Sequence, residues 1–331
     1  MNSGTPPPVG KLEPCESKVT SPGRLFSMDH PNLWRFLRSP RNSIGLALVL
    51  GSALLRPAAQ APVDPSAAAS ELFRKVITNQ QNSEILLDEY ERVQLVEKRH
   101  TGSNSDPVDS KFWRIFPTGT GVDKIGLSSD GKPPNSEAYR NDLEKLERYL
   151  HWIAQDGPMQ KEAYAKAERK RKERADLIEA THRAFRFTFE GKELRGDRPL
   201  LRYRMEPNPD FRPTTRNEII FSRVRGVIWI DEQSCQLAKI QGSVTEDIAI
   251  ALFLAKVYKG SQFMQERYEV APGIWQPTFE QYDFDGRRFL VPFSIHERSF
   301  YSHYRRVGLP KEAAEAVRAE LSKLEGDKTT R

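Results

Sequence analysis

The side chains that most often carry catalysis are few and scattered in this chain. Five of the six histidines follow residue 61, and none of them sits with a pair of carboxylates at metal-ligand spacing: His100, His151, His182, His296 and His303. The sequence contains no G-x-S-x-G, H-E-x-x-H, G-x-x-x-x-G-K-[ST] or C-x-x-C motif, and no G-x-G-x-x-G before a helix. It therefore predicts no metal site, no cofactor and no enzymatic activity.

The remaining reactive groups also have ordinary explanations. The pairs Glu246-Asp247 and Asp283/Asp285 fall at expected strand ends and turns, where acidic residues are common for local reasons. Cys235 lies near an expected hairpin turn and lacks the neighbouring histidine that an activated thiol needs. Cys15 precedes the signal-like segment described below, so a processed chain keeps Cys235 alone and has no internal disulfide.

Aromatic side chains on expected strands are the most abundant resource for binding. Eleven of them could line one concave face and form an apolar ligand cavity: Trp113, Phe187, Phe189, Tyr203, Trp229, Phe263, Trp275, Phe279, Phe284, Phe289 and Phe293. In such a cavity, an acyl chain would gain about 0.8 kcal/mol per buried methylene without any catalytic residue. Alternatively, the same residues pack against helices and leave no room for a ligand. Both interpretations stay open at this point.

The region 216–307 must position most of these aromatics, and its pattern predicts long antiparallel strands. Apolar residues alternate at Phe289, Val291, Phe293 and Ile295, which places them on one face of a sheet. Three chain reversals are expected, around Asp231 to Ser234, at Ala271-Pro272-Gly273 and at Asp285-Gly286. The apolar stretch 248–258 is interpreted as one buried strand because of its hairpin neighbours.

Further helices and strands are expected outside the region 216–307. The spacing predicts helices over 67–81, 136–154, 160–182 and 310–326, and strands over 86–99, 111–117, 185–189 and 199–205, while 119–135 has the composition of a loop. In the second helix, Leu143, Leu146, Leu150 and Ile153 form one apolar stripe. The run 161–174 has seven basic and three acidic residues. It is interpreted either as a patch for anionic lipid or an acidic partner, or as a solvated helix face.

The net charge of +6 is concentrated at the N-terminus. Residues 1–61 hold 7 Lys/Arg against 3 Asp/Glu, and the rest of the chain holds 44 against 42, which argues against nucleic-acid binding. Basic residues precede the apolar run 44–55, and small residues with an A-x-A match at 59–61 follow it. This is the pattern of a cleaved secretory signal; an uncleaved anchor or a buried helix remains the alternative. Met28 is the alternative start of translation, because a basic segment of ordinary length before the apolar run begins there.

Four segments carry a resemblance to a known family: "RVRGVIWIDEQSCQLAKIQGSVTEDI", "MEPNPDFRP", "GLSSDGKPPNSE" and "YSHYRRV". They resemble an uncharacterised bacterial group described as outer-membrane lipoprotein-sorting-protein-like, within the LolA/LolB/LppX-like superfamily. The resemblance covers roughly residues 66–307. It implies a half-open antiparallel β-barrel capped by helices, with a hydrophobic cavity for acyl chains. The long, charged segment 137–182 departs from the LolA carriers.

These observations combine into one expectation. The fold is β-rich α+β, a curved antiparallel sheet (a half-open, LolA-like β-barrel) with an N-terminal helix and a helical-hairpin lid. Residues 1–61 form the leader and signal, 62–307 the half-barrel with its insert 136–182, and 308–331 a charged tail. The expected function is an exported, periplasmic or secreted, non-enzymatic carrier or sensor for a lipid or acylated protein. The alternative is an envelope scaffold that holds a protein partner through the insert. Contact with a membrane would be transient or through an uncleaved signal.

Overall fold

The computed structural model describes residues 65–99, 108–129, 136–215, 217–250, 255–289 and 291–329, all within one compact unit. The predicted signal segment 44–55, the possible start at Met28, and Arg216 lie outside these residues. Among the described helices, none is both long enough and apolar enough to cross a membrane.

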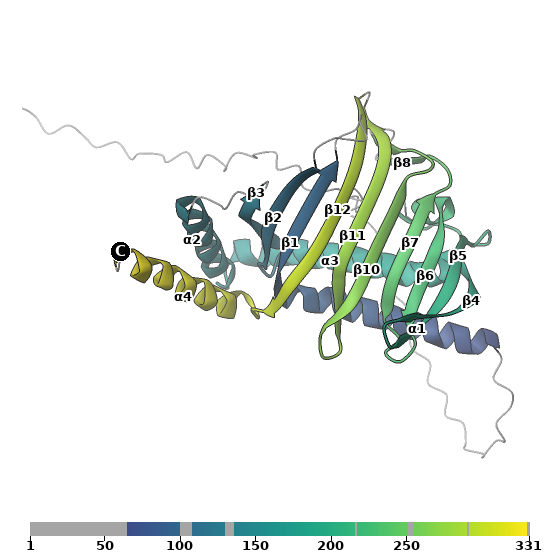
Figure 1. The fold of residues 1–331 in the computed structure, drawn as a ribbon, viewed down its shortest axis with the longest axis horizontal. Helices are drawn as coiled ribbons and strands as arrows, with labels where there is room; N and C mark the ends of the chain where they lie inside the picture. The colour runs from purple at the N-terminus through teal and green to yellow at the C-terminus, as the bar shows by residue number, and fades with distance from the viewer. Residues whose placement is uncertain are drawn as a thin grey trace, which may run out of the picture. The chain divides into compact units, whose positions relative to one another are not determined.

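A single antiparallel sheet of 12 strands dominates the fold (Figure 1). The order is β3-β2-β1-β12-β11-β10-β7-β6-β5-β4, and β8 and β9 attach beside β11. The edge strands β3 and β4 are not paired with each other, so the sheet is open, which confirms the expected fold class. The strands are β1 Tyr90–Arg99, β2 Val108–Pro117, β3 Val122–Ser129, β4 Phe185–Arg195, β5 Arg198–Pro207, β6 Val224–Asp231, β7 Leu237–Val244, β8 Ile248–Ile250, β9 Ala255–Val257, β10 Gln262–Ala271, β11 Ile274–Arg288 and β12 Val291–Arg306.

Two helices cover one face of this sheet. In Figure 1, α1 (Pro65–Leu86) and α3 (Pro158–Ala184) run across the strands on the same side. Phe73 and Val76 of α1 and Leu177 and Ala180 of α3 join a buried cluster with apolar side chains of β4 to β9. We call this side of the sheet the helix-covered face. It holds the larger hydrophobic core, which also contacts the short helix η3 (Asn217–Arg223).

A second core lies beside the β3 edge. There α2 (Ser136–Ile153) packs against α4 (Pro310–Thr329) and against Phe116 and Ile125 of the sheet. The predicted stripe of α2 forms this contact through Leu143, Leu146 and Leu150, and its fourth member, Ile153, is also completely buried. The two helices of the predicted insert are therefore both present, but each packs against a different helix, α2 against α4 and α3 against α1.

The expected reversal at Asp285-Gly286 is wrong. Strand β11 continues through both residues to Arg288, with Asp285 opposite Ser294 and Gly286 opposite Phe293. A Cβ on Gly286 would lie 2.2 Å from the Lys256 carbonyl oxygen and 2.7 Å from the Phe293 ring. This glycine therefore serves close packing of neighbouring strands instead of a turn with positive φ.

Two further expectations need correction. Residues 122–129, interpreted as loop, form β3; their only fully buried apolar side chain is Ile125, so the alternation that identifies a strand is weak. The stretch 248–258 is not one strand but two short ones, β8 and β9, which pair with each other around residues 251–254, outside the described residues.

Candidate ligand-binding face

One row of cross-strand partners crosses eight strands of the helix-covered face. Because directly opposed residues in antiparallel strands point to the same side of a sheet, the register places these side chains on one face. The row comprises Val96, Ser299, Glu280, Gln265, Ile240, Ile228, Tyr203 and Phe189. From β12 to β10 it is polar, and from β7 to β4 it is apolar or aromatic. We call these two parts the polar half and the apolar half.

The apolar half is packed against α1. The ring of Phe73 stacks on Phe187 with centroids 4.1 Å apart and meets Tyr203 edge-on at 5.1 Å. Phe263 and Phe293 pack against the same cluster. Four of the eleven predicted cavity residues are thus brought together, and side chains of α1 and α3 occupy the space in front of them.

The polar half is a hydrogen-bonded network that the sequence analysis missed. The Glu280 carboxylate accepts hydrogen bonds from the Tyr301 hydroxyl and from Gln265 Nε2, each at 2.8 Å. Gln94 Nε2 in turn lies 3.0 Å from the Tyr301 oxygen and 3.1 Å from Ser299 Oγ. Burial, reinforced by the Glu280 charge, raises the pKa of Tyr301 and of nearby Tyr282 well above the usual value. Both phenols therefore stay neutral at physiological pH.

A buried arginine connects the polar half to α1. Arg267 is 2% exposed; its Nη2 donates to the Trp275 carbonyl at 3.3 Å and its Nη1 to Gln265 Oε1 at 3.3 Å. Burial lowers the pKa of Arg267, and Glu84 of α1, 4.0 Å away, opposes that effect. Nearby, Gln276 Nε2 donates to the Ser83 carbonyl of α1 at 2.9 Å, while its Oε1 has no hydrogen-bond partner among the described residues.

Two predicted cavity residues belong to a separate cluster. Trp229 and Trp275 pack with Leu200 and Ala238, away from the larger core. The Trp229 indole donates to Glu193 at 2.8 Å, and the guanidinium of Arg198 lies 5.2 Å from the Trp275 ring. This cluster is covered by side chains near the β4–β5 turn and is not part of the row described above.

The other five predicted residues are dispersed. Trp113 lies opposite Gln94, beside the polar half, and Phe284 is buried with its ring 5.5 Å from that of Tyr282. Phe189 is 52% exposed at the end of the row, and Phe289 is 58% exposed after β11. The ring of Phe279 lies 5.0 Å from that of Phe300, in a tilted arrangement on the opposite face of the sheet.

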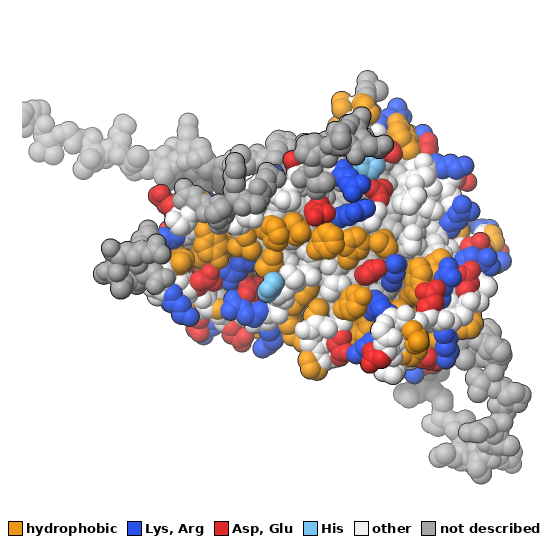
Figure 2. All heavy atoms as spheres, viewed as in Figure 1, with side chains coloured by type: hydrophobic (Ala, Val, Ile, Leu, Met, Phe, Trp, Pro, Cys, Tyr) orange, Lys and Arg blue, Asp and Glu red, His pale blue; other side chains and the backbone are white. Residues whose placement is uncertain are grey.

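The opposite face carries its own apolar row. Phe279, Phe300, Leu95 and Phe112 are successive cross-strand partners on β11, β12, β1 and β2. Figure 2 shows a band of hydrophobic side chains running across the strands on this face, which is turned away from α3. The predicted aromatic set is therefore divided between the two faces.

A Ser–His–Asp chain also lies on strands β11 and β12. His296 Nδ1 is 3.0 Å from Asp283 Oδ1, and its Nε2 is 2.9 Å from Ser294 Oγ. The Ser294 hydroxyl also donates a hydrogen bond to the Asp285 carboxylate. All four residues are cross-strand neighbours, Asp283 with His296 and Asp285 with Ser294. The sequence shows these residues only as separate acids and a scattered histidine, and the strand register is needed to unite them.

No described group of three or more His, Cys, Asp or Glu side chains is placed to hold a metal ion. Cys235, at the β6–β7 turn, is half-buried with φ 53°, and its carbonyl accepts a 3.0 Å hydrogen bond from Asn79 Nδ2 of α1. The Cys235 backbone is thus held against the helix that covers the apolar half.

No family model and no curated protein matches the chain. Solved structures do. A putative outer-membrane lipoprotein-sorting protein domain from Vibrio parahaemolyticus is similar at 9% identity and TM-score 0.28, over 71% of this chain and 93% of that one. A LolA superfamily protein from Nitrosomonas europaea is similar at 10% identity and TM-score 0.25, over 74% of this chain and 96% of that one. A DUF1329 family protein from Desulfovibrio piger is similar at 9% identity and TM-score 0.26, over 72% of this chain and 92% of that one. Two of these descriptions name the group that the sequence resembles.

Proposed function

We propose that this protein is an exported carrier or sensor that binds an amphipathic molecule, a lipid or an acylated protein, on the helix-covered face of its sheet. The observation that carries the proposal is the division of that face into a polar and an apolar half along one row of residues. An acyl chain would lie on the apolar half and its polar end on the other, so that neither part is left in an unsuitable environment.

The polar half offers specific partners for a head group. Tyr301 and Tyr282 stay protonated, and Glu280 and Gln94 supply an acceptor and a further amide. The buried side chain of Arg267 supplies positive charge at the junction with α1. Such convergent polar groups beside an apolar surface are typical of small-molecule sites.

Helix α1 would act as the lid over the apolar half. It contributes Phe73 and Val76 to the core, and Leu72 packs against the same cluster. Its polar contacts run from Asn79 to the Ser234 and Cys235 carbonyls and from the Ser83 carbonyl to Gln276. If α1 moved away, Phe187 and Tyr203 would lose their stacking partner and an acyl chain could replace Phe73. Residues 62–307 would then work as one binding unit behind the N-terminal signal, in the periplasm or outside the cell.

A disulfide lock tests the lid directly. Because the Asn79 side chain reaches the Cys235 carbonyl, Asn79→Cys is the substitution in α1 to pair with the native thiol. Oxidation should hold α1 closed and abolish uptake of a fluorescent fatty acid, and reduction should restore it. The matched control, Asn79→Cys with Cys235→Ser, should bind in both conditions. If mass spectrometry confirms the disulfide and the oxidised protein still binds with unchanged affinity, the lid is refuted.

A second candidate function is an envelope scaffold that works through α3. Three exposed cations of this helix, Lys166, Arg169 and Arg174, make no ion pair with described residues, whereas Arg171 is bound to Asp88 at 2.7 Å and to the Gly119 carbonyl. Replacing those three residues with glutamine keeps the Arg171 anchor. Loss of a protein partner in pull-downs from the envelope, with fatty-acid binding retained, would favour this function over the first.

A further inference from the structure

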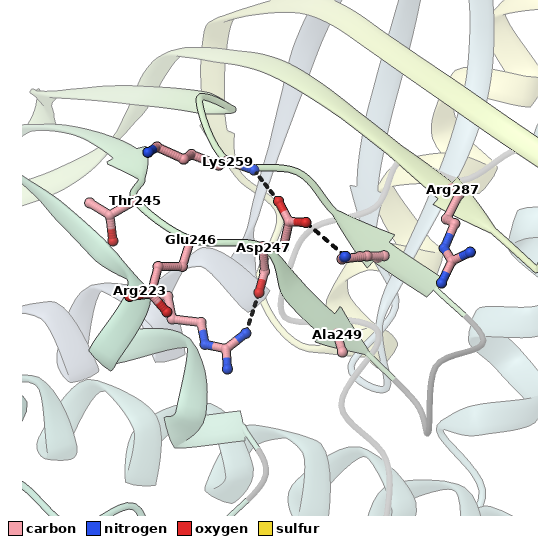
Figure 3. Close-up of a pocket in the computed structure, with 8 residues that line it drawn as sticks. Arg223, Thr245, Glu246, Asp247, Ala249, Lys259 and Arg287 are labelled. Carbon is pink, nitrogen blue, oxygen red and sulfur yellow. Dashed lines mark hydrogen bonds and ion pairs between the residues drawn. The ribbon is translucent and has the colours of Figure 1, made fainter.

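A pocket of about 640 Å³ opens at the rim of the sheet, where the β7–β8 loop meets β9 and β11 (Figure 3). Thr245 and Ala249 contribute to its wall, and the other lining side chains are charged: Arg223, Lys256, Lys259, Arg287, Glu246 and Asp247. Four cations against two carboxylates leave a net charge of +2 at neutral pH. A neighbouring hollow of about 320 Å³ shares Thr245 and Lys259 and adds Arg225.

Asp247 organises the wall of this pocket without neutralising it. Its carboxylate receives the Lys256 ammonium at 2.7 Å and the backbone N–H of Lys259 at 2.8 Å, and its carbonyl accepts from Arg223 (Figure 3). These contacts hold the pKa of Asp247 below its usual value, with Lys256 as the main cause. Asp247 is thus ionised and fully occupied, and it fixes two of the four cations in place.

The other two cations, Lys259 and Arg287, have no side-chain partner among the described residues. Neither the guanidinium of Arg287 nor the ammonium of Lys259 makes a hydrogen bond or ion pair within the described part of the chain. Arg287 Nε is also buried and has no hydrogen-bond partner among the described residues. A buried donor without an acceptor is unfavourable, and a bound anion would remove that penalty.

We propose that this rim pocket binds a phosphate group carried by a small organic molecule or by a lipid head group. An arginine fork matches the oxygens of phosphate, and lysines add point charge around it. A phosphate monoester carries about −1.5 to −2 charge at neutral pH, which balances the lining. The pocket volume exceeds what a free phosphate ion fills, so it has room for the group that carries the phosphate. The pocket lies apart from the row on the helix-covered face, and the inference goes beyond the carrier function.

Calorimetric titration with glycerol 3-phosphate at low ionic strength tests the site, with sodium chloride as the blank. The wild-type protein should bind, and Arg287→Gln should weaken binding at least about tenfold. The matched control is Arg288→Gln, which removes the adjacent, exposed arginine that does not line the pocket. It should bind like wild type. Should Arg287→Gln fail to fold by circular dichroism, Lys259→Gln gives the same comparison, because only its backbone contacts Asp247.

Vesicle sedimentation distinguishes the two sources of phosphate. Binding of glycerol 3-phosphate that depends on Arg287 supports a soluble phosphate ester. Sedimentation only with vesicles of phosphatidic acid, a lipid phosphate monoester, in phosphatidylcholine, and not with phosphatidylcholine alone, supports a head group if Arg287→Gln abolishes it and Arg288→Gln does not. Absence of both, or equal effects of the two substitutions, overturns the proposal.

Discussion

The carboxylate of Glu280 on β11 accepts a 2.8 Å hydrogen bond from the hydroxyl of Tyr301 on β12, at the centre of the polar half. The two residues are 21 positions apart in sequence and meet because the β11–β12 hairpin brings the strands side by side. This part-buried phenol donates to the carboxylate only while it keeps its proton. The hydrogen bond at the centre of the polar half therefore requires a neutral Tyr301 phenol.

Alkaline pH should destabilise the protein through these phenols. The pKa values of Tyr301 and Tyr282 are raised in the fold, so their contribution is present below the ordinary tyrosine pKa of about 10 and is lost as the pH rises above it. The free energy of unfolding in urea should fall between about pH 9 and pH 11. The double variant Tyr282→Phe/Tyr301→Phe should flatten this fall, whereas Tyr268→Phe, at an exposed tyrosine, should not. Equal slopes for all three proteins would contradict the assignment.

Arg114 should be a major contributor to stability. It is 8% exposed, pairs with Glu91 at 2.8 Å and Glu320 at 2.9 Å, and joins β2 to α4 and to Tyr139 of α2. Arg114→Leu leaves the buried Glu91 with fewer partners and should cost about 3 kcal/mol of unfolding free energy. The control Arg74→Leu breaks an exposed pair on α1 and should leave the urea midpoint unchanged. Similar midpoints for both variants would show that the network is not structurally important.

Gly226 should tolerate no side chain. A Cβ there would lie 2.1 Å from the Gln241 carbonyl oxygen, so Gly226→Ala must push β6 and β7 apart and should cost about 1–3 kcal/mol. Gly121→Ala is the matched control, because nothing lies within 4 Å of its Cβ position. Thermal unfolding of the two variants measures the difference, and a Gly226→Ala protein as stable as the control would contradict the strand spacing.

Ser294 should not behave as a catalytic nucleophile. Its hydroxyl donates to Asp285, so it cannot at the same time give its proton to His296, and the chain lies on the face away from the helices. A fluorophosphonate probe should label wild type and Ser294→Ala to the same low extent. Rapid labelling that Ser294→Ala abolishes would show an activated serine and require an enzymatic function.

Local patterns in the sequence were sufficient for most helices and strands. The stripe Leu143, Leu146, Leu150 and Ile153 predicts α2, and all four residues are buried. Strand β3 escaped prediction because Ile125 is its only fully buried apolar residue. The Asp285-Gly286 dipeptide wrongly predicted a turn. Glycine is needed there in mid-strand because the Lys256 carbonyl of β9 and the Phe293 ring leave no room for a Cβ.

The candidate site was harder to predict than the fold. Apolar alternation identifies Phe187, Tyr203 and Phe263 as inward-facing, but it does not reveal that Trp229 and Phe279 face elsewhere. The polar half depends on the register of β1, β10, β11 and β12, which unites Gln94, Gln265, Glu280 and Tyr301. Each of these residues alone looks like an ordinary surface residue.

Native mass spectrometry of the protein purified from its own host most directly tests whether the divided face holds an amphipathic ligand. We predict co-purifying masses of a lipid or acylated peptide on wild type. Phe187→Asp, which places a charge in the apolar half, should remove them, whereas Phe300→Asp on the opposite face should not. Bare protein for the wild type under gentle conditions, or a ligand retained equally by both variants, would contradict the account.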